Sequence, residues 1–284
     1  MRPAIDWPTL GASIEDGAMV QPYEVYAIRY AHHERRASAN FLGGDPEDGP
    51  MPLDYFLWLI RGNGKCYVVD TGFDEAMARR RGREFILAPE VALRALGVNH
   101  ETVEDVIITH MHHDHAGNHH LFPCAMFHLQ DKEMCFATGR AMCHHALRHP
   151  FEESDVTNMV SRVFRGRVCF HDGEEEIAPG LSVHWLGGHT AGIQCVRVFT
   201  RRGWMVLASD ASHFYANLEQ GRPFPAVHDV LAMLEGHRKL RRLASADDLI
   251  IPGHDPMVLR RFPLAIPDFK GIVRLDRDPL PTAA

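Results

Sequence analysis

The sequence lacks the features that would assign the chain to a membrane, to the secretory route or to nucleic acid. No apolar stretch reaches about 18 residues, so we predict no transmembrane helix. Residues 1–8 lack the charged-then-apolar pattern of a signal peptide. A formal net charge of -7 argues against nucleic acid as the main partner, because phosphate binding needs a basic surface.

The six cysteines also show no regular spacing, since they form no CxxC pair and no dense framework. Several lie in apolar runs, which is typical of reduced, buried thiols, so we expect a cytoplasmic protein without disulfides. An apolar content of 45% and a charged content of 24% are ordinary for a globular protein with a true core. Neither an internal repeat nor a low-complexity segment is present.

The apolar periodicity predicts strands in two groups, at about 23–130 and 167–252, with helices between them. Helices are expected at 89–96 and 227–243 and over much of 131–164. This pattern favours an α/β fold, an αββα sandwich of two packed mixed β-sheets with outer helices. We predict a single domain over 1–284, with an N-terminal arm at 1–21 and an extended C-terminal tail at 265–284.

Histidine is abundant, with 20 residues, and one stretch gives it a meaningful spacing. His110, His112, Asp114 and His115 directly follow the β-branched run 104–109, which predicts a buried strand. Open α/β sheets bind ligands outside the carboxyl ends of their strands. The His-x-His spacing allows two imidazoles to reach one ion, and Asp114 and His115 offer a carboxylate and an imidazole to a neighbouring ion. The stretch therefore predicts two adjacent metal ions.

Three isolated residues could complete these sites, because each follows a predicted strand. They are His189 in Leu-Gly-Gly-His-Thr-Ala-Gly, Asp210 in Val-Leu-Ala-Ser-Asp, and His254 in Ile-Pro-Gly-His-Asp. Taken singly, Asp210 could cap a helix and either histidine could be structural. A catalytic ion needs about three protein ligands and one open position, and together the three residues supply what the cluster lacks.

These motifs resemble those of the metallo-β-lactamase superfamily, as does the strand-ending Val-Val-Asp-Thr-Gly at 68–72. Within it, residues from about 23 to 263 are most similar to the N-acyl homoserine lactone lactonases, the quorum-quenching enzymes. The resemblance implies the metallo-β-lactamase fold, and a role for Asp70 in ordering the histidine loop from behind the ligands. It also implies a ligand set for two metals: His110, His112 and His189 for the first, Asp114, His115 and His254 for the second, with Asp210 bridging both.

One position departs from the lactonase pattern. Members of that family commonly carry a tyrosine three residues after the bridging aspartate, and here the position is His213, with Tyr215 close by. We predict that Asp114, His213 and Tyr215 act on the substrate, Asp114 by combining ligation with proton handling and the other two as hydrogen-bond donors. His113 is expected to face away from the metals. Three aromatic side chains could line an acyl pocket or belong to the core; they are Tyr55, Phe56 and Trp58.

The resulting hypothesis is a dinuclear-metal hydrolase that opens a lactone ring, most simply an N-acyl homoserine lactone, by attack of a metal-bridging hydroxide. Imidazole and carboxylate ligands suit two zinc ions first, with manganese, iron or cobalt as alternatives. The expected partner is a small-molecule lactone or ester, with no nucleic acid and no membrane. A homodimer is expected from the resemblance and from the Met-containing segment 131–164.

Three alternatives stay open on the sequence alone. One is a glyoxalase II-like thioesterase, although only about 30 residues follow His254, too few for the helical domain of that family. Another is the hydrolysis of aryl esters or phosphoesters. A non-catalytic metal-binding module is the third, and the presence of all seven ligand positions argues against it.

Overall fold

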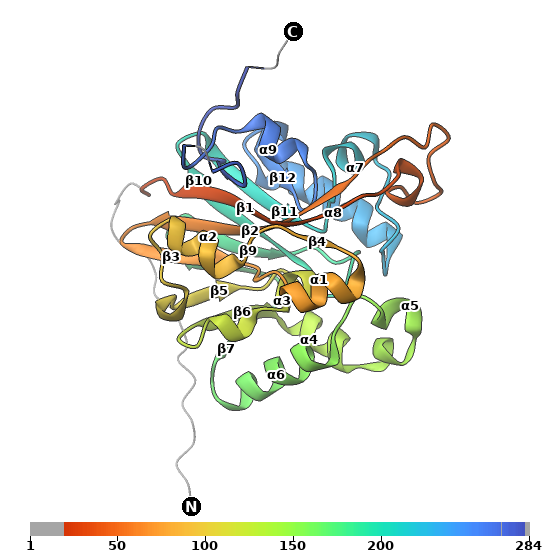
Figure 1. The fold of residues 1–284 in the computed structure, drawn as a ribbon. Helices are drawn as coiled ribbons and strands as arrows, with labels where there is room; N and C mark the ends of the chain where they lie inside the picture. Colours follow the sequence, from red (N-terminus) through yellow and green to blue (C-terminus); the bar gives the residue numbers. More distant parts are fainter. Residues whose placement is uncertain (1–19, 268, 282–284) are drawn as a thin grey trace, which may run out of the picture.

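The computed structural model describes residues 20–267 and 269–281, and its centre is formed by two β-sheets packed face to face (Figure 1). The predicted arm lies almost wholly outside the described residues. In the order of the eight-stranded first sheet, the strands are β13 (Ile272–Arg274), β1 (Glu24–His33), β2 (Leu53–Gly62), β3 (Lys65–Val69), β5 (Asp105–Ile107), β6 (Met126–Gln130) and β7 (Val168–His171), with β4 (Glu84–Phe85) paired to β1.

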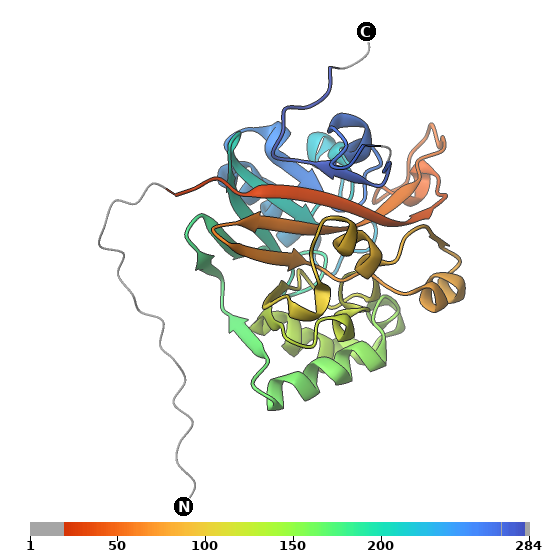
Figure 2. The same ribbon diagram turned by 60° about the vertical axis from the view of Figure 1, so that its left-hand side comes forward.

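The second sheet has five strands (Figure 2). The chain enters it from β7 through its edge strand β8, and β9 is next to β8. In spatial order its strands are β12 (Ile250–Pro252), β11 (Gly203–Ser209), β10 (Gln194–Thr200), β9 (Leu181–Trp185) and β8 (Glu174–Ala178). Parallel and antiparallel pairs occur in both sheets: β3, β5, β6 and β7 run parallel, and so do β11 and β12. The predicted sandwich of mixed sheets is therefore confirmed.

Helices cover the outer face of each sheet, as the apolar periodicity predicts. On the first sheet, α2 (Pro89–Ala95), α4 (Asp131–Thr138) and α6 (Glu153–Phe164) contribute to one apolar core. On the second, α8 (Val230–Leu243) packs against β11. Shorter helices connect the strands: α1 (Glu75–Arg81), α3 (His113–Ala116), α5 (His145–Arg148), α7 (Tyr215–Gln220) and α9 (Met257–Arg261).

Some predicted details are wrong, and each has a physical reason. The two predicted groups of strands do not coincide with the two sheets, because β7, the first strand of the second group, pairs in parallel with β6 and belongs to the first sheet. The expected C-terminal tail contains β13, which pairs with β1. An isolated bridge also joins Val273 of β13 to Leu264. Strand β8 was missed because Glu174, Glu175 and Glu176 give it no apolar alternation.

The thiols are free, as predicted, but they are not uniformly buried. Cys195 is buried, whereas Cys124, Cys135 and Cys143 are exposed because they lie on loops and helix surfaces rather than inside strands. The part of the chain that the structure describes contains no helix long and apolar enough to cross a membrane.

Several strands of both sheets end at the same edge of the sandwich, where the predicted ligands follow. At two of these ends the backbone enters the left-handed region without a glycine: φ is +60° at Asp70, after β3, and +48° at Ser209, the last residue of β11. Such conformations cost free energy in non-glycine residues and persist where the surroundings hold them. Here the hydroxyl of Ser209 lies 2.9 Å from that of Thr109, which joins the ends of the two sheets.

Candidate metal centre

The seven predicted ligands come together in two adjacent groups of four side chains that share Asp210. The loop after β5, with the start of α3, brings four of them, and the segments after β9, β11 and β12 bring one each. None is more than 8% exposed. The first group consists of His110, His112, His189 and Asp210, and the second of Asp114, His115, Asp210 and His254.

Three imidazoles and one carboxylate oxygen converge in the first group. Nδ1 of His112 lies 3.0 Å from Nε2 of His110 and 2.9 Å from Nε2 of His189. Oδ2 of Asp210 lies 3.2 Å from the same nitrogen of His189. Ligands bound at about 2.0–2.2 Å in a tetrahedral arrangement are about 3.3–3.6 Å apart, so these separations are a few tenths of an ångström shorter than those that one ion requires.

The second group is built around the other oxygen of Asp210. Oδ1 lies 3.2 Å from Nε2 of His115 and 3.0 Å from Nε2 of His254. Oδ2 of Asp114 completes the group, at 3.6 Å from His115 and 3.8 Å from His254. Because its two oxygens face different groups, Asp210 has the geometry of a bridging ligand.

The chemistry of the donor set fits divalent cations. Among the described residues, Nε2 of His115 and Oδ1 of Asp210 are buried without a hydrogen-bond partner, which is costly unless another atom contacts them. Burial, followed by the neighbouring imidazoles, lowers the pKa of His110 and of His112 well below the usual value. Both are therefore neutral and able to ligate at physiological pH, and imidazole with carboxylate is a ligand set that suits zinc.

Hydrogen bonds from behind orient three of the histidines. Nδ1–H of His115 donates to Oδ2 of Asp70 at 2.7 Å. Nδ1–H of His189 donates to the carbonyl oxygen of Ala226 at 2.6 Å, and that of His254 to the carbonyl oxygen of Asp54 at 2.9 Å. Each bond fixes the tautomer that leaves Nε2 free to ligate.

Asp70 has the supporting position that the resemblance implies. Besides His115, it accepts hydrogen bonds from the backbone N–H and the hydroxyl of Thr109, both at 2.8 Å. Its side chain is fully buried. It therefore holds the beginning and the middle of the histidine loop in one place.

Glu133, at the start of α4, is a supporting residue that the sequence did not reveal. Its fully buried carboxylate accepts hydrogen bonds from the backbone N–H of Met111 at 2.8 Å, the hydroxyl of Thr190 at 2.5 Å and the backbone N–H of Gly192 at 3.2 Å. Met111 separates His110 from His112, and Thr190 follows His189, so one carboxylate joins the two loops of the first group. The approach is so close that a Cβ on Gly192 would lie 2.0 Å from the backbone nitrogen of Glu133.

His213 lies beside the metal groups. Its Nε2 is 3.1 Å from Oδ2 of Asp210. The ring stacks on Phe224, with centroids 3.7 Å apart and planes 6° apart, and its other face lies near the ring of His254. Among the described residues, Nδ1 of His213 has no hydrogen-bond partner.

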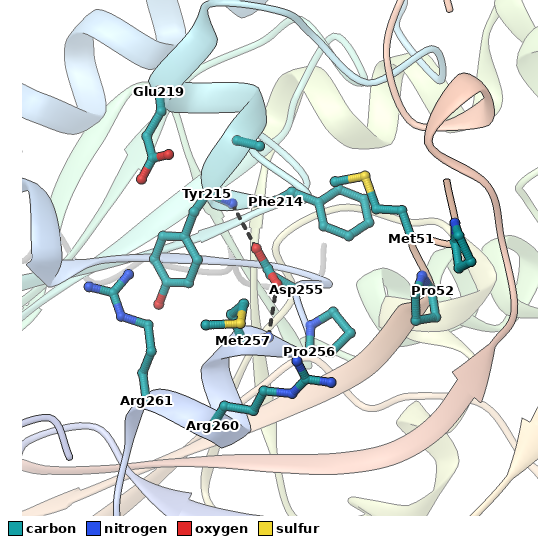
Figure 3. Close-up of a pocket in the computed structure, with 12 residues that line it drawn as sticks. Met51, Pro52, Phe214, Tyr215, Glu219, Asp255, Pro256, Met257, Arg260 and Arg261 are labelled. Carbon is teal, nitrogen blue, oxygen red and sulfur yellow. Dashed lines mark hydrogen bonds between the residues drawn. The ribbon is translucent and has the colours of Figure 1, made fainter. Parts of the chain in front are cut away.

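Tyr215 lies elsewhere. Its ring is under the guanidinium of Arg261 and lines a pocket of about 610 Å³ with Phe214 and Met257 (Figure 3). In this pocket, Asp255 accepts hydrogen bonds from the backbone N–H groups of Tyr215 and Met257. Two of the segments that line the pocket come directly after His213 and His254 in the sequence. Within the described chain, no hydrogen bond joins the Tyr215 hydroxyl to a metal-group residue.

Other aromatic and histidine side chains occupy positions that the sequence left open. Phe56 and Trp58 belong to the core between the sheets. Tyr55 packs edge-on against His254, with centroids 5.0 Å apart. His113 is in neither ligand group but is close to one of them: its Nδ1–H donates to the carbonyl oxygen of Pro150 at 3.0 Å, and the same nitrogen lies 3.3 Å from Oδ1 of Asp114. Its ring is parallel to that of Phe73.

Comparisons with known proteins agree with this fold. Residues 52–254 match the model of the metallo-beta-lactamase superfamily. An N-acyl homoserine lactonase of Bacillus cereus is 25% identical over 220 residues, which cover 72% of this chain and 82% of the relative. The predicted enzyme class, a metal-dependent hydrolase of ester bonds, agrees with that of this lactonase.

Solved structures show the same fold. A quorum-quenching N-acyl homoserine lactone lactonase superposes with a TM-score of 0.68 at 22% identity, over 84% of this chain and 95% of that one. The dizinc quorum-quenching lactonase AidC, in complex with a product, superposes with a TM-score of 0.66 at 14% identity, over 94% and 97% of the two chains.

Proposed function

The chain belongs to the metallo-beta-lactamase superfamily, and we propose that it is a dinuclear metal-dependent lactonase that hydrolyses N-acyl homoserine lactones. The observation that carries this proposal is the position of Asp210, whose two oxygens face two complete ligand groups. The similarity to the lactonase of Bacillus cereus supports the substrate class.

Two divalent ions held by these residues would supply a water-derived nucleophile near neutral pH and a Lewis acid for the carbonyl oxygen. We propose zinc for both, because neutral imidazole and carboxylate are its usual ligands outside cysteine sites. The first ion is assigned to His110, His112 and His189, and the second to Asp114, His115 and His254, with Asp210 shared.

The side chains around the ligands would orient the substrate. His213 is held flat by Phe224 and turned toward the shared carboxylate, so it can donate a hydrogen bond to a carbonyl that enters this side of the centre. Asp114 has a carboxylate oxygen close to two histidines and would hold the proton that the leaving alkoxide needs. For Tyr215 we propose no direct contact with the substrate, because its ring lies in the pocket of Figure 3.

Buried aromatic rings beside the ligands support a substrate with an apolar acyl group. Phe151 packs edge-on against His112, with centroids 4.6 Å apart, and Tyr55 packs similarly against His254. With Phe224 they form apolar surroundings on several sides of the centre. A homodimer and a cytoplasmic location stay predictions from the sequence.

Hydrolysis of a panel of substrates by the metal-loaded protein tests the proposal. The panel contains acyl homoserine lactones with short and long chains, a simple lactone, an aryl ester, a phosphotriester and a thioester of glutathione. We expect the highest kcat/KM for an acyl homoserine lactone. A higher kcat/KM for the thioester or the phosphotriester would replace the proposed substrate, and no hydrolysis by fully loaded protein would favour the non-catalytic alternative.

A further inference from the structure

A separate group of potential metal ligands lies at the edge of the first sheet, on β6 and β7. His128, Cys169 and His171 each offer one ligand atom, and these atoms all lie within 4.8 Å of one another. The group shares no residue with the metal centre described above. His128 and His171 are buried, whereas Cys169 is half-buried.

The register of the strands brings these side chains together. β6 and β7 run parallel, with His128 opposite Cys169. Side chains alternate between the two faces of a strand, so His171 shares the face of Cys169. Phe127 and Leu129 point into the core under the helices, and the three potential ligands therefore face the space between the two sheets.

Two carboxylates determine which nitrogens of the histidines are free. Nε2–H of His128 donates to Oδ1 of Asp105, on β5, at 3.1 Å. Nδ1–H of His171 donates to Oε2 of Glu175, on β8, at 2.6 Å. Metal-ligating histidines usually donate their outer N–H to a carboxylate in this way, which fixes the tautomer and increases the basicity of the inner nitrogen.

The other ring nitrogen of each histidine consequently carries a lone pair, and these two lone pairs point toward each other. Nδ1 of His128 and Nε2 of His171 are 3.0 Å apart, and the ring planes differ by only 8°. Two facing lone pairs repel unless a cation lies between them, and the candidates are a metal ion and a shared proton. The two carboxylates add negative charge, and the sulfur of Cys169 adds a third ligand atom, which together favour a metal ion over a single proton.

We propose that His128, Cys169 and His171 form a third metal site for one zinc-type ion, distinct from the catalytic centre. Imidazole with thiolate is a frequent ligand combination for Zn²⁺. Tetrahedral ligation at about 2.0–2.1 Å needs the two nitrogens about 3.3 Å apart, so binding opens the pair by a few tenths of an ångström. β7 is an edge strand, where such a movement displaces little of the core.

The position of the site indicates a structural role. Asp105, His128 and His171 belong to consecutive strands of the first sheet, and Glu175 belongs to the second sheet. An ion here would join the two sheets where β7 leads into β8. Burial raises the pKa of the Cys169 thiol, so binding displaces a proton from sulfur, and affinity is expected to fall as the pH falls.

A cobalt titration of the metal-free protein tests the site, because its readout differs from that of the catalytic centre. Thiolate ligation to Co²⁺ gives a charge-transfer absorption in the near ultraviolet, and the seven ligands of the catalytic centre include no sulfur. We expect this band in the wild type and a third bound ion per chain. Cys169→Ser should lose the band and one ion while retaining lactone hydrolysis.

Cys66→Ser is the matched control, since Cys66 is also half-buried in a strand of the first sheet but outside the histidine group, and it should retain the band. If Cys169→Ser does not fold, protection of the Cys169 thiol from alkylation by added Zn²⁺, measured by peptide mapping, provides the same test in the wild type. Only two bound ions, no band and unprotected Cys169 would overturn the proposal and leave a shared proton between the histidines. Failure of lactone hydrolysis alone would overturn the proposed function and not this site.

Discussion

His213 and Asp210 are in direct contact: Nε2 of the histidine lies 3.1 Å from Oδ2 of the carboxylate. The same oxygen lies 3.2 Å from Nε2 of His189. His213 is thus close enough to act on a substrate at the first ligand group, yet that group is complete without it. This arrangement separates the residue that we assign to substrate orientation from the residues that we assign to metal binding.

Replacement of His213 should therefore lower activity without removing metal. We expect His213→Ala to decrease kcat for lactone hydrolysis by about 10²–10³, the usual cost of losing one donor to a developing oxyanion. Metal content, measured by elemental analysis, should equal that of the wild type. His213→Tyr, which introduces a hydroxyl donor, should retain more activity than His213→Ala. Unchanged kinetics in His213→Ala, or loss of metal from it, would contradict the assignment.

Asp70→Asn should weaken metal binding. The amide group keeps the size of the carboxylate but cannot accept from His115 and Thr109 through two charged oxygens, so the tautomer of His115 is no longer fixed. Loss of such a support typically costs about 10- to 100-fold in metal affinity or activity. Competition with a chromophoric chelator measures the affinity, and Asp172→Asn, at an exposed carboxylate, is the control. Equal affinities in the two variants would show that Asp70 does not support the site.

Glu133→Gln should loosen the first ligand group in particular. Both oxygens of Glu133 accept hydrogen bonds, one from the loop of His110 and His112 and the other from the loop of His189. An amide NH₂ would face one of these donors, so we expect about tenfold weaker binding of one of the two ions at the centre of Asp210, while the other ion of that centre is retained. A titration that resolves the two binding steps of this centre, carried out in the Cys169→Ser background, tests this expectation. Two unchanged steps would mean that the clamp is dispensable.

Asp155, in the first turn of α6, should make stability depend on pH. Burial, followed by the nearby Glu152, raises the pKa of this carboxyl to about 7. In the unfolded chain it ionises near pH 4 (about 3.9), so as the pH rises from about 4 to 7 the unfolded state loses its proton first and the folded state is progressively destabilised. Asp155→Asn, which is neutral at every pH, should raise the free energy of unfolding at pH 8 by on the order of 1–3 kcal/mol.

Urea unfolding of the metal-loaded wild type and of Asp155→Asn, at several pH values between 4.5 and 8, measures this effect. The difference between the two proteins should grow with pH and level off above the folded-state pKa. Asp172→Asn again provides an exposed control. A difference that is constant across this range would show that Asp155 ionises normally in the folded protein.

The sequence predicted which seven side chains come together because their positions follow from local spacing and from strand ends. His110 and His112 are two residues apart, and His189, Asp210 and His254 each follow a strand. The sandwich was predictable for a similar reason, since apolar runs mark strands and the order of strands and helices favours two covered sheets. Strand β8, with its row of glutamates, gave no such signal.

What the sequence could not show depends on register and on direction. The group of His128, Cys169 and His171 exists only because β6 and β7 pair in one particular register. Glu133 is a charged residue on a predicted helix, and nothing in its neighbours indicates that α4 buries it against two loops. Tyr215 is close to Asp210 in the chain, but it begins α7, which directs its ring into a different pocket.

The most direct test of the central claim is a comparison of lactone hydrolysis with metal content in the wild type and in Asp210→Asn. The account predicts that the wild type hydrolyses an acyl homoserine lactone in proportion to the ions bound at the centre of Asp210, reaching full activity with two. Asp210→Asn, whose amide nitrogen cannot ligate, should lose at least one of these ions and about 10² or more in kcat/KM. Full hydrolysis by metal-free protein, or by Asp210→Asn, would contradict it.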